Sequence, residues 1–191
     1  MNIKALAGLA LLAATLHAAP VLAQSAAKLV GAQSEVTFVT KQMGVPVDGR
    51  FKKFDAQINL DPKKPETGNV AFSIDTGSAT LGVPESDAEM PKAIWFNVSK
   101  FPQASFKSTA IKGLGNGKFE VAGKLDIKGQ SRDVVVPVQI TQSGGTSTAT
   151  GSFVIKRLDF KIGDGDWKDT SMVANDVQVR FKLALTGVGA L

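Results

Sequence analysis

The sequence predicts an all-β fold, an antiparallel eight-stranded barrel with one short helical segment. Three observations predict it. Apolar and polar residues alternate with period two in many stretches of the chain, the segments between them are short and rich in turn residues, and helical periodicity is scarce. Short connections favour antiparallel neighbours. Without helices to cover it, the apolar face must be buried within the sheet, in a sandwich or a closed barrel, and up-and-down strands favour the barrel.

The alternation is clearest in Val70–Asp75, Phe119–Ile127 and Val177–Thr186. Phe51 is out of phase with Phe54 and the residues after it, which predicts a bulge there. Pro137 predicts that its strand lies at an edge or carries a bulge, because proline has no N–H for a ladder. The predicted strands are residues 35–41, 50–60, 70–75, 104–112, 119–127, 132–142, 146–156 and 177–186.

Turn residues separate these strands, at Asp61–Pro65, Gly113–Gly117, Lys128–Gln130 and Ser143–Gly145. The segment Pro84–Met90 predicts a short turn of helix, because its acidic residues suit a helix N-terminus. This segment is too short and too polar to cover a sheet.

The N-terminus has the features of an export signal. Lys4 is followed by the apolar run Ala5–Leu16 and then by Val21–Ala23, which has small residues where a signal peptidase reads them. The run is too short and too interrupted for a membrane span. We therefore expect a signal peptide over residues 1–23, cleavage before Gln24, one β-barrel domain over residues 24–191, and a periplasmic or secreted protein.

The composition excludes several kinds of chemistry. The 191 residues include no Cys, no Tyr and a single histidine, His17, which the predicted cleavage removes. The mature chain then has no His or Cys metal site, thiol nucleophile, histidine base or disulfide. An enzyme of lipid metabolism that uses carboxylates alone stays open, but a non-enzymatic binding protein is the first expectation. With a net charge of +5 and no aromatic-basic motif, an exported chain is not expected to bind nucleic acid.

An acidic run near the C-terminus hints at a calcium loop. Its spacing does not match an EF-hand, so solvated turns are the preferred interpretation and no metal or cofactor is expected. The run consists of Asp159, Asp164, Asp166, Asp169 and Asp176.

Large apolar side chains fall on the inward phase of the strands: Phe38, Phe54, Phe72, Phe106, Phe153, Ile155 and Phe181. They allow either a filled barrel or an apolar cavity, which periodicity cannot separate. Trp95 and Trp167 lie on loops, where they would gate a ligand, anchor to a membrane surface or plug the barrel end. Arg157 continues an inward phase and needs an anion or several acceptors. Asp159 is the structural candidate, and a ligand head group is the functional one.

Several stretches together carry a family resemblance. They are Ser34–Phe38, Val47–Phe51, Phe101–Ser108, Val121–Gly129 and Arg157–Gly163. In order and spacing the chain resembles the YceI-like family of secreted, lipocalin-like proteins, over nearly all of residues 27–186. The resemblance implies a barrel around an apolar tunnel that binds polyisoprenoid or other long amphiphilic lipids, in some members isoprenoid quinones. Some secreted relatives capture lipophilic antibiotics. Many relatives carry histidines near the first strand, where this chain has Gln33 and Lys41.

The expected function is that of a periplasmic carrier or sequestering protein for a long-chain isoprenoid lipid or quinone, with transient contact with a membrane surface. The alternatives are capture of lipophilic small molecules such as antibiotics, or a filled barrel that acts through its surface. A homodimer stays open. The expected ligand-binding residues are Phe38, Phe54, Phe72, Trp95, Phe106, Phe153, Ile155, Arg157, Trp167 and Phe181.

Overall fold

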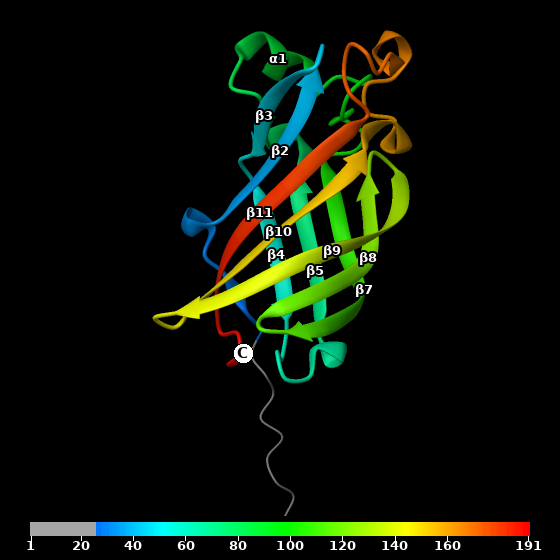
Figure 1. Ribbon diagram of the computed structural model, residues 1–191. Coiled ribbons are helices and arrows are strands. Elements are labelled where there is room, and N and C mark those ends of the chain that lie inside the picture. Colours follow the sequence, from blue (N-terminus) through cyan, green and yellow to red (C-terminus); the bar gives the residue numbers. More distant parts are fainter. Residues whose placement is uncertain (1–25) are drawn as a thin grey trace, which may run out of the picture.

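A computed structural model describes residues 26–191, and the predicted signal peptide lies outside these residues. The described chain is a strongly curled antiparallel sheet (Figure 1). Its strands are β1 Lys28–Leu29, β2 Glu35–Gln42, β3 Val45–Phe51, β4 Phe54–Asn59, β5 Asn69–Asp75, β6 Ala79–Thr80, β7 Gln103–Gly115, β8 Lys118–Ile127, β9 Gln130–Ser143, β10 Thr146–Lys156 and β11 Asp176–Thr186. The helices are α1 Pro84–Glu89 and the 3-10 turns η1 Gly31–Gln33, η2 Pro65–Thr67, η3 Thr76–Ser78, η4 Arg157–Phe160 and η5 Gly165–Lys168.

The strand order explains how the sheet curls into a barrel. The strands follow one another as β4-β5-β7-β8-β9-β10-β11-β2-β3-β6, and the short strand β1 pairs with β11. Just before β1, the Ala27 N–H donates to the carbonyl of Ile58 in β4 at 2.8 Å. The segment of Ala27 and β1 thus links β11 to β4, which is the first strand of the order, and this link closes the sheet into a barrel. The predicted antiparallel barrel is confirmed.

The strand count differs from the prediction, with eleven strands in residues 26–191 instead of eight. The sequence signal that was missed is the Met43–Gly44 turn, whose φ angles of 49° and 82° are those of a tight hairpin between β2 and β3.

The expected bulge near Phe51 is wrong. There β3 ends, and β4 begins at Phe54 after Lys52 and Lys53. Both of these lysine N–H groups bond to Ser78, so the chain bends and resumes in a new strand.

Pro137 lies inside the sheet, since β9 is flanked by β8 and β10. The pairing of β9 with β10 ends at Val138 and Gly151, one residue from the proline. Beyond this point residues 130–137 of β9 and 152–156 of β10 are not paired with each other. We call this region the seam. Pro137 therefore faces a local edge, as its missing N–H requires.

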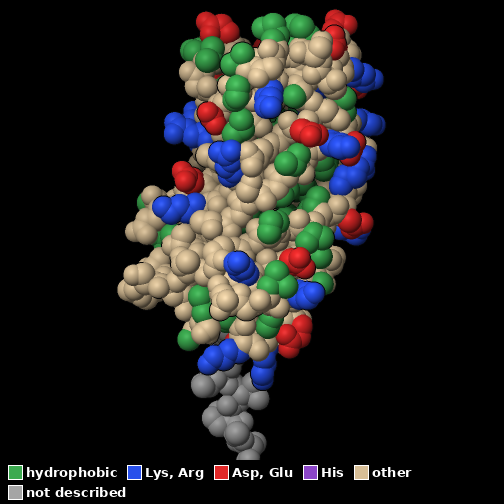
Figure 2. All heavy atoms as spheres, viewed as in Figure 1, with side chains coloured by type: hydrophobic (Ala, Val, Ile, Leu, Met, Phe, Trp, Pro, Cys, Tyr) green, Lys and Arg blue, Asp and Glu red, His purple; other side chains and the backbone are tan. Residues whose placement is uncertain are grey.

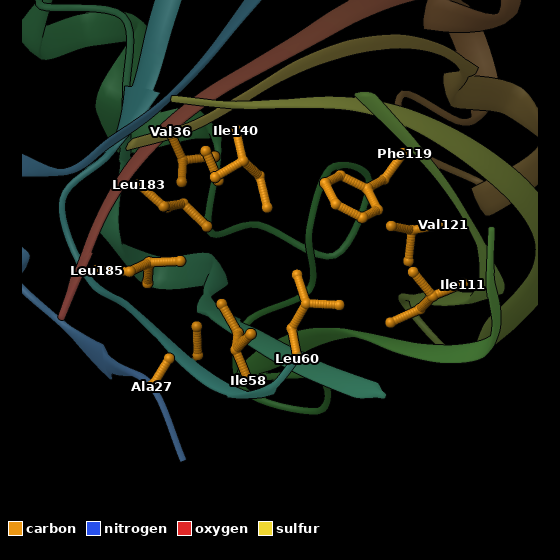
Figure 3. Close-up of a cluster of buried hydrophobic side chains, with 12 residues drawn as sticks. Ala27, Val36, Ile58, Leu60, Ile111, Phe119, Val121, Ile140, Leu183 and Leu185 are labelled. Carbon is orange, nitrogen blue, oxygen red and sulfur yellow. The ribbon is translucent and has the colours of Figure 1, made fainter. Parts of the chain in front are cut away.

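Two clusters of buried apolar side chains occupy the inside of the barrel. One lies at the end of the barrel near the C-terminus and includes Ile58, Phe119 and Leu185. Its side chains point inward from opposite walls (Figure 3). The other includes Leu125, Ile155 and Phe160, nearer to α1 and the 3-10 turns. Within residues 26–191, no helix has the length and apolar character needed to cross a membrane.

Candidate ligand-binding cavity

The barrel is hollow. A cavity of about 380 Å³ lies between its walls, which is within the range of small-molecule sites. Its deep end lies among Ile58, Leu60, Phe119 and the other side chains that surround the open centre of Figure 3. The predicted alternative of a filled barrel is not what the structure has.

The cavity opens at the end where α1 and the turns η4 and η5 lie (Figure 1). Two lining residues there, Glu89 of α1 and Trp167 of η5, are exposed to solvent. Ser86, Met90 and Gln42 also line the cavity at this end, which we call the mouth. The short helix was expected not to cover the sheet, and it does not. It forms part of the rim of the cavity.

Nine of the ten expected ligand-binding residues line this cavity. They are Phe38, Phe72, Trp95, Phe106, Phe153, Ile155, Arg157, Trp167 and Phe181. Phe54 does not line it. Its ring stacks on that of the lining residue Phe72, with 5.9 Å between the centroids.

Glycines explain why so many phenylalanines leave the centre open. A Cβ at Gly49 would lie 2.2 Å from Phe38 Cζ, and a Cβ at Gly151 would lie 2.3 Å from Phe181 Cζ. Each pair faces across neighbouring strands. The rings therefore lie against the wall, in the space that a side chain would fill, and do not project across the barrel. The ring of Phe106 lies in the same way over Gly123.

The two tryptophans meet at the mouth. Their ring centroids are 5.4 Å apart, with Trp95 half-buried and Trp167 40% exposed. They come from loops distant in sequence, α1–β7 and η4–β11, which the fold brings together. Both rings line the cavity, and that of Trp167 also reaches solvent.

Arg157 is buried, with only 2% of its surface exposed. Its side chain makes five hydrogen bonds at 2.5–3.0 Å, all to backbone carbonyls, from Ile162, Gly163, Trp167, Val173 and Ala174. The expected ion pair with Asp159 is wrong, because carbonyl oxygens of the η4–β11 loop satisfy the guanidinium. Burial lowers the pKa of Arg157 from its ordinary value. Its role is to hold the loop that carries Trp167 against the barrel end.

Polar groups are few in the lining, and sequence reasoning missed them. Thr40 of β2 is 8% exposed, and its Oγ1 is the one buried side-chain nitrogen or oxygen of residues 26–191 that has no hydrogen-bond partner. A signal for it was present, since Thr40 continues the inward phase of Val36 and Phe38. The other polar lining residues are Gln42, Ser86, Glu89, Ser105 and Arg157.

The acidic run forms turns. Asp164 accepts from the N–H of Gly165 and pairs with Lys168 at 2.8 Å, and Asp169 accepts from the N–H and hydroxyl of Ser171. These hydrogen bonds lower the pKa values of both carboxyls. Over residues 26–191, no three His, Cys, Asp or Glu side chains are grouped so that they could hold a metal ion.

The comparison with known families decides the relationship. A family model described as the YceI-like domain matches residues 28–185, which is most of the described chain. The chain belongs to the YceI-like family. The expected family membership is therefore confirmed.

The chain is similar to one sequence relative and to two solved structures. A UPF0312 protein of Vibrio cholerae is 32% identical over 115 residues, which are 60% of this chain and 61% of that protein, so the match spans less than two thirds of its length. The crystal structure of BcnA from Burkholderia cenocepacia is 44% identical with a TM-score of 0.80, covering 82% of this chain and 99% of BcnA. A polyisoprenoid binding domain from Saccharophagus degradans shares the fold, at 19% identity and a TM-score of 0.67, covering 84% of this chain and 97% of that domain.

Proposed function

We propose that this YceI-like protein is a periplasmic binding protein that carries or sequesters a long-chain isoprenoid lipid, such as an isoprenoid quinone, inside its barrel. The observation that carries the proposal is the hollow, apolar interior, which reaches solvent at the end where α1 lies. A lipid tail inside it would be held by removal of apolar surface from water, at about 25 cal/mol per Å². Such binding needs no directional groups, which agrees with the sparse polar lining.

The choice of an isoprenoid ligand is supported by the relatives. The Saccharophagus degradans domain with the same fold is described as polyisoprenoid binding. A periplasmic location is supported by the predicted export signal over residues 1–23. The role is one of binding without turnover: among the lining residues the one carboxylate is Glu89, which lies at the mouth and pairs with Lys92.

Transient contact with a membrane surface is part of the proposal, because a long lipid must enter and leave the barrel. Exposed apolar side chains lie at the mouth end, on the β2–β3 turn, before α1 and on the η4–β11 loop. The exposed apolar residues of these segments are Met43, Val45, Val83, Trp167 and Met172. Figure 2 shows hydrophobic side chains at the end where α1 lies. The N–H of Met43 donates to the carbonyl of Met172 at 2.9 Å, so two of these segments are joined. Apolar groups at a rim of this kind suit insertion into a lipid surface.

The first experiment is native mass spectrometry of the protein purified from its own periplasm, followed by organic extraction. We expect a discrete added mass that extracts into solvent as an isoprenoid lipid. An extracted lipophilic compound of another class would favour the alternative role in capturing small molecules. A bare chain that stays bare after incubation with quinones and polyprenyl lipids would contradict the proposal.

A cavity-filling variant tests the location of the ligand. Ala149 is a buried lining residue of β10, and Ala149→Phe puts a ring into the cavity. Ala110→Phe on β7 is the matched control, since Ala110 is exposed and does not line the cavity. We expect the added mass to disappear in Ala149→Phe and to persist in Ala110→Phe, with circular dichroism confirming that both variants fold. Retention of ligand by a folded Ala149→Phe would exclude the interior as the binding site.

A further inference from the structure

The charged groups in the cavity lining limit which head groups a ligand can carry. Among the lining residues two are charged, Glu89 and Arg157. Arg157 is the one cation, and its five N–H groups already donate to five backbone carbonyls. A guanidinium has five N–H donors, so none is left for a ligand. A phosphate in the cavity could bind Arg157 only by displacing the bonds that hold the η4–β11 loop.

Three lysines near the mouth also have protein partners. Lys92 pairs with Glu89 at 2.5 Å, and Lys168 pairs with Asp164 at 2.8 Å. Lys128 donates to the carbonyls of Ile94 and Lys161, which flank lining residues. Burying a phosphate without a free cation is costly. The inside of the cavity is therefore poorly suited to a polyprenyl phosphate or diphosphate.

Thr40 provides an uncharged polar group without a partner in the described residues, unlike the charged side chains above. It lies on β2 between Phe38 and Gln42, on the way from the deep end of the cavity to the mouth. Its hydroxyl is buried and has no hydrogen-bond partner in residues 26–191. A buried hydroxyl without a partner costs free energy, and a ligand that provides one recovers it. Because a hydroxyl both donates and accepts, it suits an uncharged oxygen such as a ketone carbonyl or an alcohol.

We infer that the cavity selects isoprenoid lipids with an uncharged, oxygen-bearing head group, such as a quinone or an isoprenoid alcohol, and that Thr40 hydrogen-bonds this head group. The tail occupies the deep end among Ile58, Phe119 and Leu185. This inference rests on the proposed function, since it takes the ligand to be an isoprenoid.

Three probes with the same tail test the inference: farnesene, farnesol and farnesyl diphosphate. Their affinities are measured by titration calorimetry or by the fluorescence of Trp95 and Trp167, which line the cavity. For the wild type we expect farnesol to bind at least about tenfold more tightly than farnesyl diphosphate. For Thr40→Val we expect farnesol to lose about three- to tenfold in affinity, as for one neutral hydrogen bond, and farnesene to be unchanged. Thr37→Val, on the opposite face of β2, is the control.

The outcomes separate the inference from the proposed function. Failure of all three probes to bind would overturn the proposed isoprenoid function and the inference with it. Binding of farnesyl diphosphate as tightly as farnesol would overturn the head-group selection while leaving isoprenoid binding intact. Equal losses for farnesol and farnesene in Thr40→Val would show that Thr40 acts through packing, which overturns the hydrogen bond.

Discussion

Arg157 and Thr40 are two polar side chains inside an apolar barrel, and they differ in whether the protein satisfies them. The free-energy cost of burying Arg157 is offset by hydrogen bonds to five backbone carbonyls of the loop between η4 and β11. The Thr40 hydroxyl has no partner in the described chain. The burial of Arg157 is therefore compensated by hydrogen bonds, whereas the burial of the Thr40 hydroxyl lowers the stability of the ligand-free fold. An uncompensated polar group in a cavity is typical of a position that serves a ligand.

Replacing Arg157 by lysine should strongly destabilise the fold. Lysine keeps the charge but has three donors in place of five, so at least two of the carbonyls lose this partner. We expect a loss of about 2–5 kcal/mol in the free energy of unfolding, measured by urea denaturation. The exposed Arg180, which bonds to Gln178, provides the control Arg180→Lys, expected to change stability by less than about 0.5 kcal/mol. Similar effects in the two variants would contradict the structural role of Arg157.

Replacing Thr40 by valine should have the opposite effect on stability. Removal of the unpartnered hydroxyl is expected to raise the free energy of unfolding of the ligand-free protein by about 1 kcal/mol. Thr37→Val on the outer face of β2 is expected to change it by less than about 0.5 kcal/mol. Both are measured by thermal and urea unfolding of delipidated protein. A Thr40→Val variant less stable than the wild type would show that the hydroxyl has a partner in solution.

At the level of elements, glycines in the strands and the short helix α1 shape the cavity. Gly49, Gly123 and Gly151 each accommodate a phenylalanine ring from nearby in the wall, so the strands carry large rings without filling the barrel. The helix is held in place by Asp87, which accepts hydrogen bonds from the Thr80 hydroxyl and the Leu81 N–H. Wall and rim are thus set by contacts between elements.

The substitution Gly49→Ala tests the wall. A Cβ there overlaps the ring of Phe38 and no backbone atom is among its three nearest contacts, so the ring must move toward the cavity. We expect a destabilisation of about 1–3 kcal/mol and weaker lipid binding. Gly31→Ala is the control, because a Cβ at Gly31 meets nothing within 4 Å. Unchanged binding by Gly49→Ala, measured alongside unfolding, would mean that the ring position does not control access.

The attachment of α1 should depend on pH through Asp87. The hydrogen bond from Thr80, and then that from Leu81, lower the pKa of Asp87 below its ordinary value of 3.8. A lowered pKa in the folded state adds stability above about pH 4, and this is lost as the pH falls through the lowered value. We therefore expect Asp87→Asn to be less stable than the wild type at pH 7, with the difference shrinking below pH 4.

The pH series is followed by urea unfolding and by amide exchange of Leu81. Glu85→Gln, on the same helix, is the control for the loss of one negative charge. A difference between wild type and Asp87→Asn that stays constant down to pH 2 would contradict the role of the carboxylate.

At the scale of the whole molecule, the strand pairing is interrupted at the seam, where residues 130–137 and 152–156 have no pairing with each other. Val135 and Val154 in this region are exposed, at 59% and 57%. Locally unpaired backbone opens more readily than a fully bonded ladder. The seam is therefore the part of the wall best suited to widen when a bulky tail enters.

Amide hydrogen exchange tests this property of the seam. We expect faster exchange in residues 152–156 of β10, which pair with β11 alone, than in residues 146–151, which pair with both β9 and β11. A bound lipid should slow exchange at the mouth and the cavity wall. Uniform protection along β10 would show that the seam is closed in solution.

Much of the fold could be predicted because its signals are local. Period-two alternation located the strands, Gly and Pro marked the turns, and nine inward aromatic, aliphatic and cationic residues were identified by phase or loop position. Phase also assigned Phe54 to the cavity, but Phe54 is not among its lining residues, and its ring stacks on the lining residue Phe72. The division of residues 50–60 into β3 and β4 depends on Ser78, a distant partner that no local pattern contains.

The sequence was enough to predict an antiparallel barrel with an apolar inside, and its family. The three-dimensional contacts were needed to show that the barrel is hollow, that carbonyls and not Asp159 satisfy Arg157, and that the Thr40 hydroxyl has no partner in the described cavity wall. Periodicity reports which side of a strand a residue occupies. How far a ring extends from the wall, or which distant backbone atoms meet a buried charge, depends on contacts between segments such as Phe181 with Gly151 and Arg157 with Val173.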